Sequence, residues 1–282
     1  MCNSNIIKDL KIPIGIYSIL KCEHCNLEFI DPQPDFEEIK SIYTSDYYKA
    51  WGMEKEEKNS LKKMKKNTFE QRIKLLSNYK KTGNILDIGT ASGFFLEVAK
   101  NFGFEPYGVE LSEYSAKLAQ QKFGQDKIYH GILENCPFPK LFFDVIAMSD
   151  LLEHVQNPIS LLECASQFLK EDGIIIITTP NTESFSRKIM GKKWTQYKPE
   201  HLFYFDKKSI YYLANLIGLK ILKIQPAWKS INLKYFDDQF SIYKNTFITP
   251  IVHMITTIFF PIKNFNFNVL LGEFVILMGK NK

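Results

Sequence analysis

The fold is decided by the stretch Asp87-Ile88-Gly89-Thr90-Ala91-Ser92-Gly93. It begins in the apolar run Ile85–Ile88 and precedes the helical pattern Phe94–Phe102, so it predicts a turn between a strand and a helix. Gly89 would let a ligand approach the backbone, and Gly93 would let the helix pack close to the strand. Because ligands of parallel sheets bind where strands lead into helices, this turn is a candidate binding loop.

The alternation of strands and helices continues along the chain. Further strands are predicted at Glu105–Val109, Ile128–Tyr129, Phe143–Met148, Ile174–Thr178, Leu219–Ile224 and Glu273–Met278, and helices at Glu113–Phe123, Pro158–Leu169 and Lys208–Leu216. Strands that alternate with helices of this length imply right-handed crossovers and a parallel sheet covered on both faces. The sequence therefore predicts an α/β fold.

Three parts are expected along the 282 residues: an N-terminal extension at 1–60, a core at 61–230, and an apolar helical insertion with the final strand at 231–282. The apolar share of 45% and the charged share of 24% are those of a globular protein. The net charge of +5 comes almost entirely from lysine, with arginine only at Arg72 and Arg187, so no arginine cluster predicts a nucleic-acid partner.

Cysteine usage and the apolar segments indicate where the protein works. Five cysteines are an odd number in a chain too long to need disulfides, and the N-terminus lacks a signal-peptide pattern, so we expect a cytoplasmic location. The uncharged stretch Asn245–Ile262 is broken by Pro250 and Pro261, which does not favour a membrane span.

A carboxylate after the second strand indicates the ligand. Glu110 ends that strand, 21 residues after Gly89, where it can accept both hydroxyl hydrogens of a ribose. A dinucleotide loop would carry glycine in place of Ala91, and Asp87 would repel a pyrophosphate. S-adenosylmethionine has a ribose, an amino group and a sulfonium but no phosphate, so it suits this loop better.

The motifs together resemble one enzyme family. They are Ile85–Leu96, Glu110, Phe143–Ile146, Leu152–Val155 with Asn157-Pro158, Leu169–Gly173, Thr179–Asn181, and Pro199–Leu202 before Phe205. This set, which covers roughly residues 84–225, resembles the class I S-adenosylmethionine-dependent methyltransferases, although many members carry Cys and Gly where Thr90 and Ala91 stand here. The fold that this resemblance implies is a Rossmann-like doubly wound sheet, mostly parallel with an antiparallel final strand.

The resemblance also implies the roles of individual residues toward the cofactor. Asp87 and Gly89, in a loop with Thr90 and Gly93, would face the methionine end, and Glu110 would bind the ribose. The adenine would contact Leu111, Ile132 and Leu133. Ser149 and Asp150 would border the methyl group.

Methyl transfer from a sulfonium mainly needs a positioned acceptor, plus a group that removes a proton from a hydroxyl or amine. His154 and His201 are the candidate bases, although His201 could equally be a core histidine bonded to backbone. Asp150, Glu153 and His154 resemble a metal-binding cluster of methyltransferases that methylate quinone precursors. We favour the alternative that Glu153 and His154 cap and brace the helix at Pro158, and predict no metal.

The acceptor stays open among a small-molecule hydroxyl, amine or carbon, including quinone precursors and sugars of surface polysaccharides. A nicotinamide-dependent reductase of the short-chain type is an alternative, because Tyr204 and Lys208 have the Tyr-x-x-x-Lys spacing of such enzymes. A non-catalytic cofactor-binding subunit is another.

Two segments lie outside these motifs. Cys22-x-x-Cys25 resembles half of the zinc ribbon that precedes this domain in some relatives, but only Cys2 lies upstream, so we expect a degenerate remnant without zinc unless His24 or a partner contributes. Within Tyr243–Phe267 apolar residues recur at helical spacing, namely Ile248, Ile251, Val252, Ile255, Ile258 and Phe259. That face would pack on the protein itself or a second subunit, or lie on a membrane. The oligomeric state is not predicted.

Overall fold

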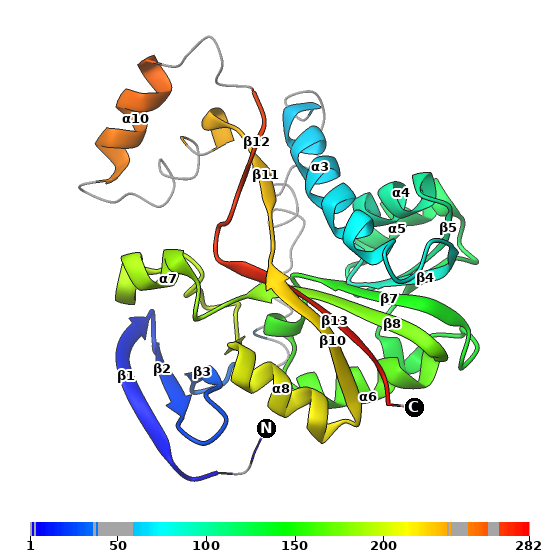
Figure 1. Ribbon diagram of the computed structural model, residues 1–282, viewed down its shortest axis with the longest axis horizontal. Coiled ribbons are helices and arrows are strands. Elements are labelled where there is room, and N and C mark those ends of the chain that lie inside the picture. Colours follow the sequence, from blue (N-terminus) through cyan, green and yellow to red (C-terminus); the bar gives the residue numbers. More distant parts are fainter. Residues whose placement is uncertain are drawn as a thin grey trace.

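The computed structural model describes residues 2, 4–35, 38, 59–235, 237, 248–258 and 265–281. Its centre is a seven-stranded sheet with helices on both faces (Figure 1). The strands, in spatial order, are β10 (Leu219–Pro226), β13 (Glu273–Lys280), β8 (Leu169–Pro180), β7 (Phe143–Ser149), β4 (Gly83–Ile88), β5 (Phe104–Glu110) and β6 (Ile128–His130).

The five strands from β8 to β6 run parallel, and β13 pairs antiparallel with both β8 and β10. The predicted α/β sheet with an antiparallel final strand is therefore confirmed. The chain leaves β4 toward β5 and β6 on one side and returns to β7 and β8 on the other. In sheets of this kind the ligand usually binds in the crevice at such a reversal, which here means beyond the carboxyl ends of β4 and β7.

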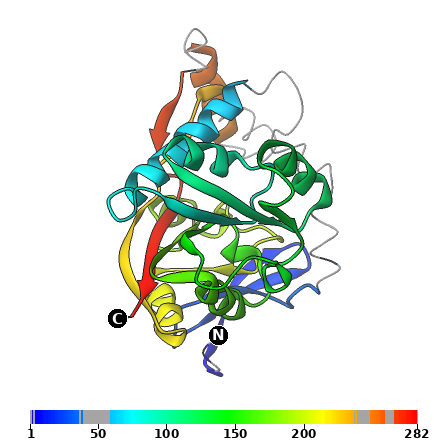
Figure 2. The ribbon, with the colours of Figure 1, turned by 90° about the vertical axis from the view of Figure 1, so that its right-hand side faces the viewer.

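Helices lie on both faces of the sheet (Figure 2), and an apolar core fills the space on each face. On one face lie α3 (Asn59–Leu76), α4 (Phe94–Asn101) and α5 (Glu113–Phe123). On the other lie α6 (Pro158–Phe168) and α8 (Lys207–Leu216). Neighbouring residues of β4 illustrate the division, since Ile85 packs in the first core and Leu86 in the second.

The N-terminal residues form a smaller sheet, in the order β1 (Ile7–Ile14), β2 (Tyr17–Cys22), β3 (Glu28–Asp31) and β9 (Phe203–Tyr204). Because β9 belongs to the segment that follows β8, this sheet joins the N-terminus to the core. The pairs Glu28 with Tyr204 and Phe29 with Phe203 make that connection.

Shorter elements connect and extend the core. They are η1 (Leu133–Asn135), η2 (Leu152–His154), α7 (Phe185–Met190), η3 (Gly191–Lys193), β11 (Lys229–Ile231), α10 (Ile248–Ile258) and β12 (Phe267–Val269). In Figure 1, β11 and β12 lead away from the central sheet toward α10. The predicted helix within 243–267 is thus present as α10, while residues 243–247 and 259–264, which include Phe259, lie outside the described residues. In the described parts of the chain, no helix combines the length and the apolar character that crossing a membrane requires.

Candidate active site

The loop after β4 adopts the conformation that its glycines allow. Gly89 has a φ of +74°, and the amides of Gly89 and Thr90 both donate to the carbonyl oxygen of Val109 at the end of β5, at 2.8 and 3.2 Å. A Cβ atom on Gly89 would lie 3.2 Å from Cδ1 of Leu151, so a side chain there would be crowded as well as strained. The backbone at Gly89 is therefore left bare, as the sequence predicted.

Gly93 serves a different contact from the one expected. Its φ is +80°, and a Cβ atom would lie 2.6 Å from the ring of Phe123 on α5. The close approach that Gly93 permits is thus between the start of α4 and α5, whereas the sequence suggested an approach of helix to strand.

Asp87 is a buried acid in need of a partner. It is the second-to-last residue of β4, only 2% of the residue is exposed, and its Oδ1 has no hydrogen-bond partner among the described residues. Burial raises the pKa of Asp87 to about 7, and the nearby Glu110 carboxylate adds to the rise. A cationic amino group would supply the missing partner, so the site fits the methionine end of S-adenosylmethionine.

Glu110 ties two loops together at the end of β5. Its Oε2 accepts a hydrogen bond from the amide of Ala91 at 2.7 Å, and its Oε1 accepts one from the amide of Ser112 at 2.8 Å. Each carboxylate oxygen has two lone pairs, so both can accept a ribose hydroxyl in addition. Glu110 therefore has the position and the acceptor capacity that the predicted role requires.

The three predicted adenine contacts differ in exposure. Leu111 and Ile132 are 40% and 42% exposed. They follow the neighbouring strands β5 and β6, whose ends are joined by a hydrogen bond of 2.9 Å from the amide of Gly131 to the carbonyl oxygen of Glu110. Leu133 is 2% exposed and packs in the core beneath the sheet. Leu111 and Ile132 are thus the pair that can present apolar surface to an adenine ring.

The half-buried Ser149 ends β7, and the exposed Asp150 that follows it belongs to a group of charged residues that the sequence did not connect. Asp150 has a φ of +54°. Nη2 of Arg72, on α3, lies 3.8 Å from Oδ2 of Asp150 and 3.7 Å from Oε2 of Glu273, at the start of β13. Glu273 also forms an ion pair with Lys229 of β11. Four segments far apart in the chain therefore meet at one end of the sheet.

Arg72 is the buried cation of this group. Its side chain is 4% exposed, and its Nε and Nη1 have no hydrogen-bond partner among the described residues. The pKa of Asp150 is lowered, because Lys229 and Arg72 together outweigh the opposing effect of burial. An arginine with unbonded N–H groups beside the crevice is suited to the carboxylate of the cofactor's methionine end. The feature of the sequence that could have indicated this role is that Arg72 is an arginine in a helix whose other basic residues are lysines.

The two candidate bases lie in direct contact. His154, in η2, has its Nδ1 2.8 Å from the carbonyl oxygen of Glu200, and its ring packs at 90° on that of His201 with centroids 4.7 Å apart. Glu153 is 1% exposed and accepts a hydrogen bond from Oγ1 of Thr179 at 2.8 Å. The amide of Leu202 donates to the carbonyl of Glu153 at 2.7 Å, which holds the segment of His201 against η2.

The predicted capping role of Glu153 and His154 is wrong. The side chain of Asn157 caps α6 by accepting a hydrogen bond from the amide of Ser160 at 3.1 Å. Asn157 stands directly before Pro158, the first residue of α6, and can therefore reach the free amides of the first turn. Glu153 and His154 belong instead to the group formed with His201.

Burial determines the protonation of this group. Burial lowers the pKa of His154 to about 4. It also lowers the pKa of His201 well below its usual value, and the neighbouring His154 lowers that pKa further. Burial raises the pKa of Glu153 well above the usual range, aided by Asp150. Both imidazoles are therefore neutral near pH 7, the form in which a ring can act as a general base, although burial makes each a weaker base than a free histidine.

The side chains that could share a metal ion differ from the cluster of Asp150, Glu153 and His154 considered from the sequence. One ligand atom each from Glu153, His154 and His201 lies within 4.8 Å of the others, whereas Asp150 is not in this group and forms an ion pair with Arg72. That this site works without a metal stays a prediction.

Comparisons with known proteins agree with this geometry. A family model described as a methyltransferase domain matches residues 60–224. An uncharacterized protein of Methanocaldococcus jannaschii is 30% identical over 170 residues, which are 58% of this chain and 78% of the relative. The ubiquinone biosynthesis O-methyltransferase of Leptothrix cholodnii is 27% identical over 157 residues, which are 52% of this chain and 65%, just under two thirds, of that enzyme.

A solved structure shares the fold. The S-adenosylmethionine-dependent methyltransferase from Thermotoga maritima, described as a possible histamine N-methyltransferase, has a TM-score of 0.57 and 17% identity. The match covers 88% of this chain and all of that one.

Proposed function

Because the chain belongs to the methyltransferase domain family and is an S-adenosylmethionine-dependent methyltransferase, we propose that it methylates a hydroxyl group of a small aromatic acceptor, of the kind found in quinone precursors. When bound, S-adenosylmethionine supplies an activated methyl group on its sulfonium. The observation that carries the proposal is the pair of neutral imidazoles, His154 and His201, next to the end of β7.

The residues on each side of the crevice have distinct tasks in this proposal. Asp87, Arg72 and Glu110 hold the cofactor through its amino group, its carboxylate and its ribose. Ser149 and Asp150 border the acceptor, and His154 or His201 accepts the proton that a hydroxyl loses when its oxygen is methylated. The similarity to ubiquinone biosynthesis O-methyltransferases supports a phenolic acceptor, and the polysaccharide sugar is the second candidate.

The alternative of a short-chain-type reductase is wrong. In such an enzyme the tyrosine hydroxyl and the lysine would act together at the substrate. Here Tyr204 is fully buried, its hydroxyl donates to the carbonyl of Lys198 at 3.1 Å, and Lys208 is exposed on α8.

The acceptor is tested by incubating the full chain with labelled S-adenosylmethionine and matched sets of catechols, anilines and free sugars. Transfer to catechols that is lost when the phenolic hydroxyl is already methylated supports the proposal. Transfer confined to amines or sugars contradicts it, and a lack of transfer to any acceptor, with cofactor bound, favours the non-catalytic subunit.

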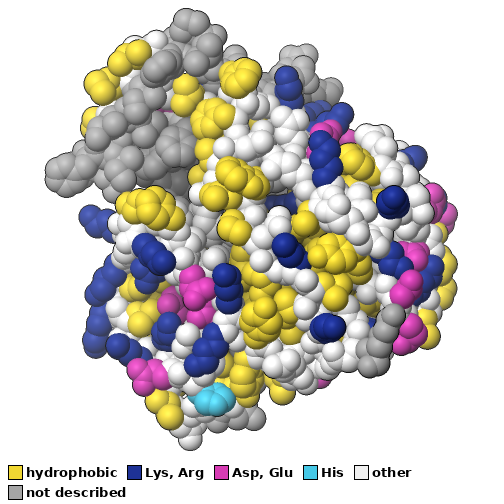
Figure 3. Space-filling view, in the orientation of Figure 1, with side chains coloured by type: hydrophobic (Ala, Val, Ile, Leu, Met, Phe, Trp, Pro, Cys, Tyr) yellow, Lys and Arg dark blue, Asp and Glu magenta, His cyan; other side chains and the backbone are white. Residues whose placement is uncertain are grey.

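We further propose that the acceptor reaches this site from an anionic membrane surface. Phe185 and Ile189, one turn apart on α7, are 76% and 66% exposed, and Lys188, Lys192 and Lys193 beside them are exposed as well. Figure 3 has a hydrophobic group over α7 with lysine and arginine side chains gathered next to it, over the N-terminal sheet. Apolar side chains surrounded by lysines are typical of surfaces that bind anionic lipid.

Within α10, Met254 and Ile258 are 57% and 64% exposed, so this helix is the second candidate contact. Co-sedimentation with phosphatidylglycerol vesicles should be lost in Phe185→Ser/Ile189→Ser, or in Met254→Ser/Ile258→Ser if α10 is the contact. Leu216→Ser, at an exposed leucine of α8, is the matched control. Equal amounts of wild type and both double variants in the pellet, or wild type wholly in the supernatant, would contradict a membrane contact.

A further inference from the structure

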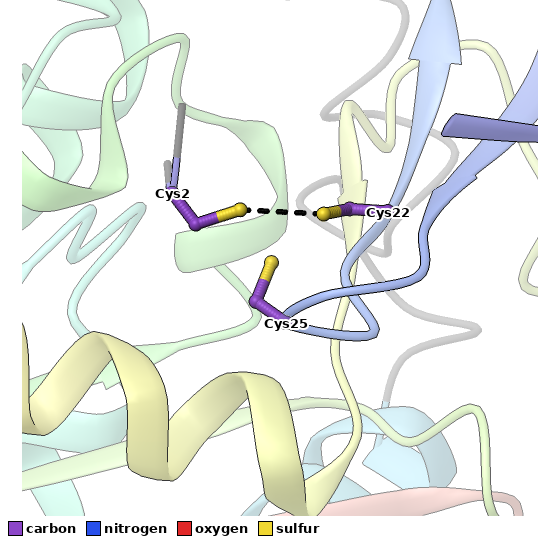
Figure 4. A group of neighbouring side chains, drawn as sticks. All are labelled: Cys2, Cys22 and Cys25. Atoms are coloured by element: carbon purple, nitrogen blue, oxygen red, sulfur yellow. Dashed lines mark hydrogen bonds between the residues drawn. The ribbon is translucent and has the colours of Figure 1, made fainter. Parts of the chain in front are cut away.

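Three thiols meet in the N-terminal sheet, away from the methyltransferase site. Cys22 ends β2, Cys25 lies in the turn before β3, and Cys2 precedes β1. The Sγ atoms of Cys2 and Cys22 are 3.2 Å apart, and all three Sγ atoms lie within 4.8 Å of one another. In Figure 4 the three side chains point toward a common centre. None of the three forms a disulfide.

The turn between β2 and β3 is built around two of these sulfurs. The amide of Asn26 donates to the carbonyl of Cys22 at 2.8 Å, and Asn26 has a φ of +65°. This conformation closes a tight turn that carries Cys22 on one side and Cys25 next to Asn26. Two cysteines separated by two residues on such a turn are a common arrangement for a pair of zinc ligands.

The sulfurs are also shielded from solvent. Cys22 and Cys25 are 4% and 1% exposed and pack in the same core as the central sheet. If the three sulfurs are deprotonated, thiolates at this separation repel one another, and a cation between them offsets that repulsion. A thiophilic ion such as Zn²⁺ prefers sulfur ligands in a tetrahedral arrangement.

We propose that Cys2, Cys22 and Cys25 bind a Zn²⁺ ion through three thiolates, with a water molecule or another small ligand at the fourth position. Any thiol proton is released to solvent as the metal–sulfur bond forms. Among the described residues, no fourth Cys, His, Asp or Glu offers a ligand atom at this centre. His24 is exposed, and its ring contacts that of Tyr212 with centroids 5.5 Å apart, so it is directed elsewhere.

This proposal replaces the expectation of a remnant without zinc. The sequence offered one Cys-x-x-Cys pair, and nothing in the spacing placed Cys2 next to it. The structure brings them together because β1 pairs antiparallel with β2, with Ile7 opposite Cys22. The ion would link the N-terminal strand to the β2–β3 turn. The next strand, β3, pairs with β9, which directly follows the segment that contains His201.

The test uses the full chain, reduced with a phosphine and loaded with Zn²⁺ or Co²⁺ before exhaustive dialysis. We expect one equivalent of zinc to be retained, and the Co²⁺ form to show a thiolate-to-cobalt charge-transfer band in the near ultraviolet. Both should be lost in Cys22→Ser and in Cys2→Ser, and kept in the matched controls Cys136→Ser and Cys164→Ser, which alter free cysteines outside the cluster.

The cobalt band of the wild-type chain gives an answer even if a variant fails to fold. Its absence would overturn the proposal, as would zinc retained equally by Cys22→Ser, which would show that the ion is held outside the thiol cluster. A Cys2–Cys22 disulfide that forms in air and leaves no zinc bound after reduction would also overturn it, in favour of a redox pair.

Discussion

The ring of His154 stands perpendicular to that of His201, with centroids 4.7 Å apart. The contact joins η2, directly after β7, to the segment before β9, and it is reinforced by the hydrogen bond from the amide of Leu202 to the carbonyl of Glu153. Because burial lowers the pKa of both rings, both are unprotonated at neutral pH, which is the form a general base must have before the reaction.

The pH dependence of turnover follows from this burial. An exposed histidine loses its ability to accept a proton as the pH falls through about 6.5. Because the pKa of His154 is lowered to about 4 and that of His201 also lies well below normal, we expect the acidic limb of kcat to lie below about pH 5. A limb centred near pH 6.5 in a labelled methyl-transfer assay would show that neither ring is the base.

Replacing the base should separate chemistry from binding. We expect His154→Asn or His201→Asn to lower kcat by about 10²–10⁴-fold, the usual contribution of a general base, while affinity for S-adenosylhomocysteine is unchanged. His253→Asn, at an exposed histidine on α10, is the control. If both site variants turn over at the wild-type rate, positioning alone carries the reaction.

The buried carboxylate of Asp87 should lower the unfolding free energy of the free protein at high pH, although the same group is expected to bind the cofactor. Its pKa is about 7 in the folded state against 3.8 in the unfolded chain, so the folded state holds the extra proton and loses stability as the pH rises from about 4 to 7. Asp87→Asn should therefore stabilise the free protein at pH 8 by roughly 1–4 kcal/mol, since each pKa unit is worth about 1.4 kcal/mol.

Urea denaturation at pH 5.5 and 8 measures that change, with the exposed Asp126→Asn as control. The same Asp87→Asn variant should lose the stabilisation that S-adenosylhomocysteine gives to the wild type. A variant that is less stable than the wild type at pH 8 and still binds the ligand would contradict both the burial argument and the assignment.

Arg72 should matter for both folding and binding. Arg72→Met leaves the buried Glu273 with Lys229 as its remaining cation, and we expect a loss of roughly 3 kcal/mol, the lower end for a broken buried ion pair. Affinity for S-adenosylhomocysteine should also fall if Arg72 binds its carboxylate. Lys66→Met, at an exposed pair with Glu70 on the same helix, should cost less than about 1 kcal/mol. Equal unfolding free energies for the two variants would refute the role of Arg72.

The sequence predicted the central sheet and the cofactor loop because their signals are local. The helix predicted at Glu113–Phe123 has those bounds in the structure, with Ser112 as its cap. Apolar runs and glycine turns are properties of neighbouring residues, and they fix β4, β5 and the loop between β4 and α4 without knowledge of the rest.

The charged group at the crevice could not be predicted in the same way. Arg72 and Glu273 are brought together only because β13 inserts between β8 and β10, a pairing that no local pattern encodes. The N-terminal strands were missed for a related reason: β1 carries Lys8 and Lys11 on exposed positions and gains its order by pairing with β2.

The central claim is that S-adenosylmethionine binds between Asp87 and Glu110. Calorimetric titration of S-adenosylhomocysteine into Glu110→Gln tests it most directly, because the amide keeps the shape of the side chain but loses its charge and part of its acceptor capacity. We expect affinity to fall by about 1–3 kcal/mol, the cost of losing a partner of buried polar groups, while the exposed Glu113→Gln binds as the wild type does. Wild-type affinity in Glu110→Gln would contradict the account.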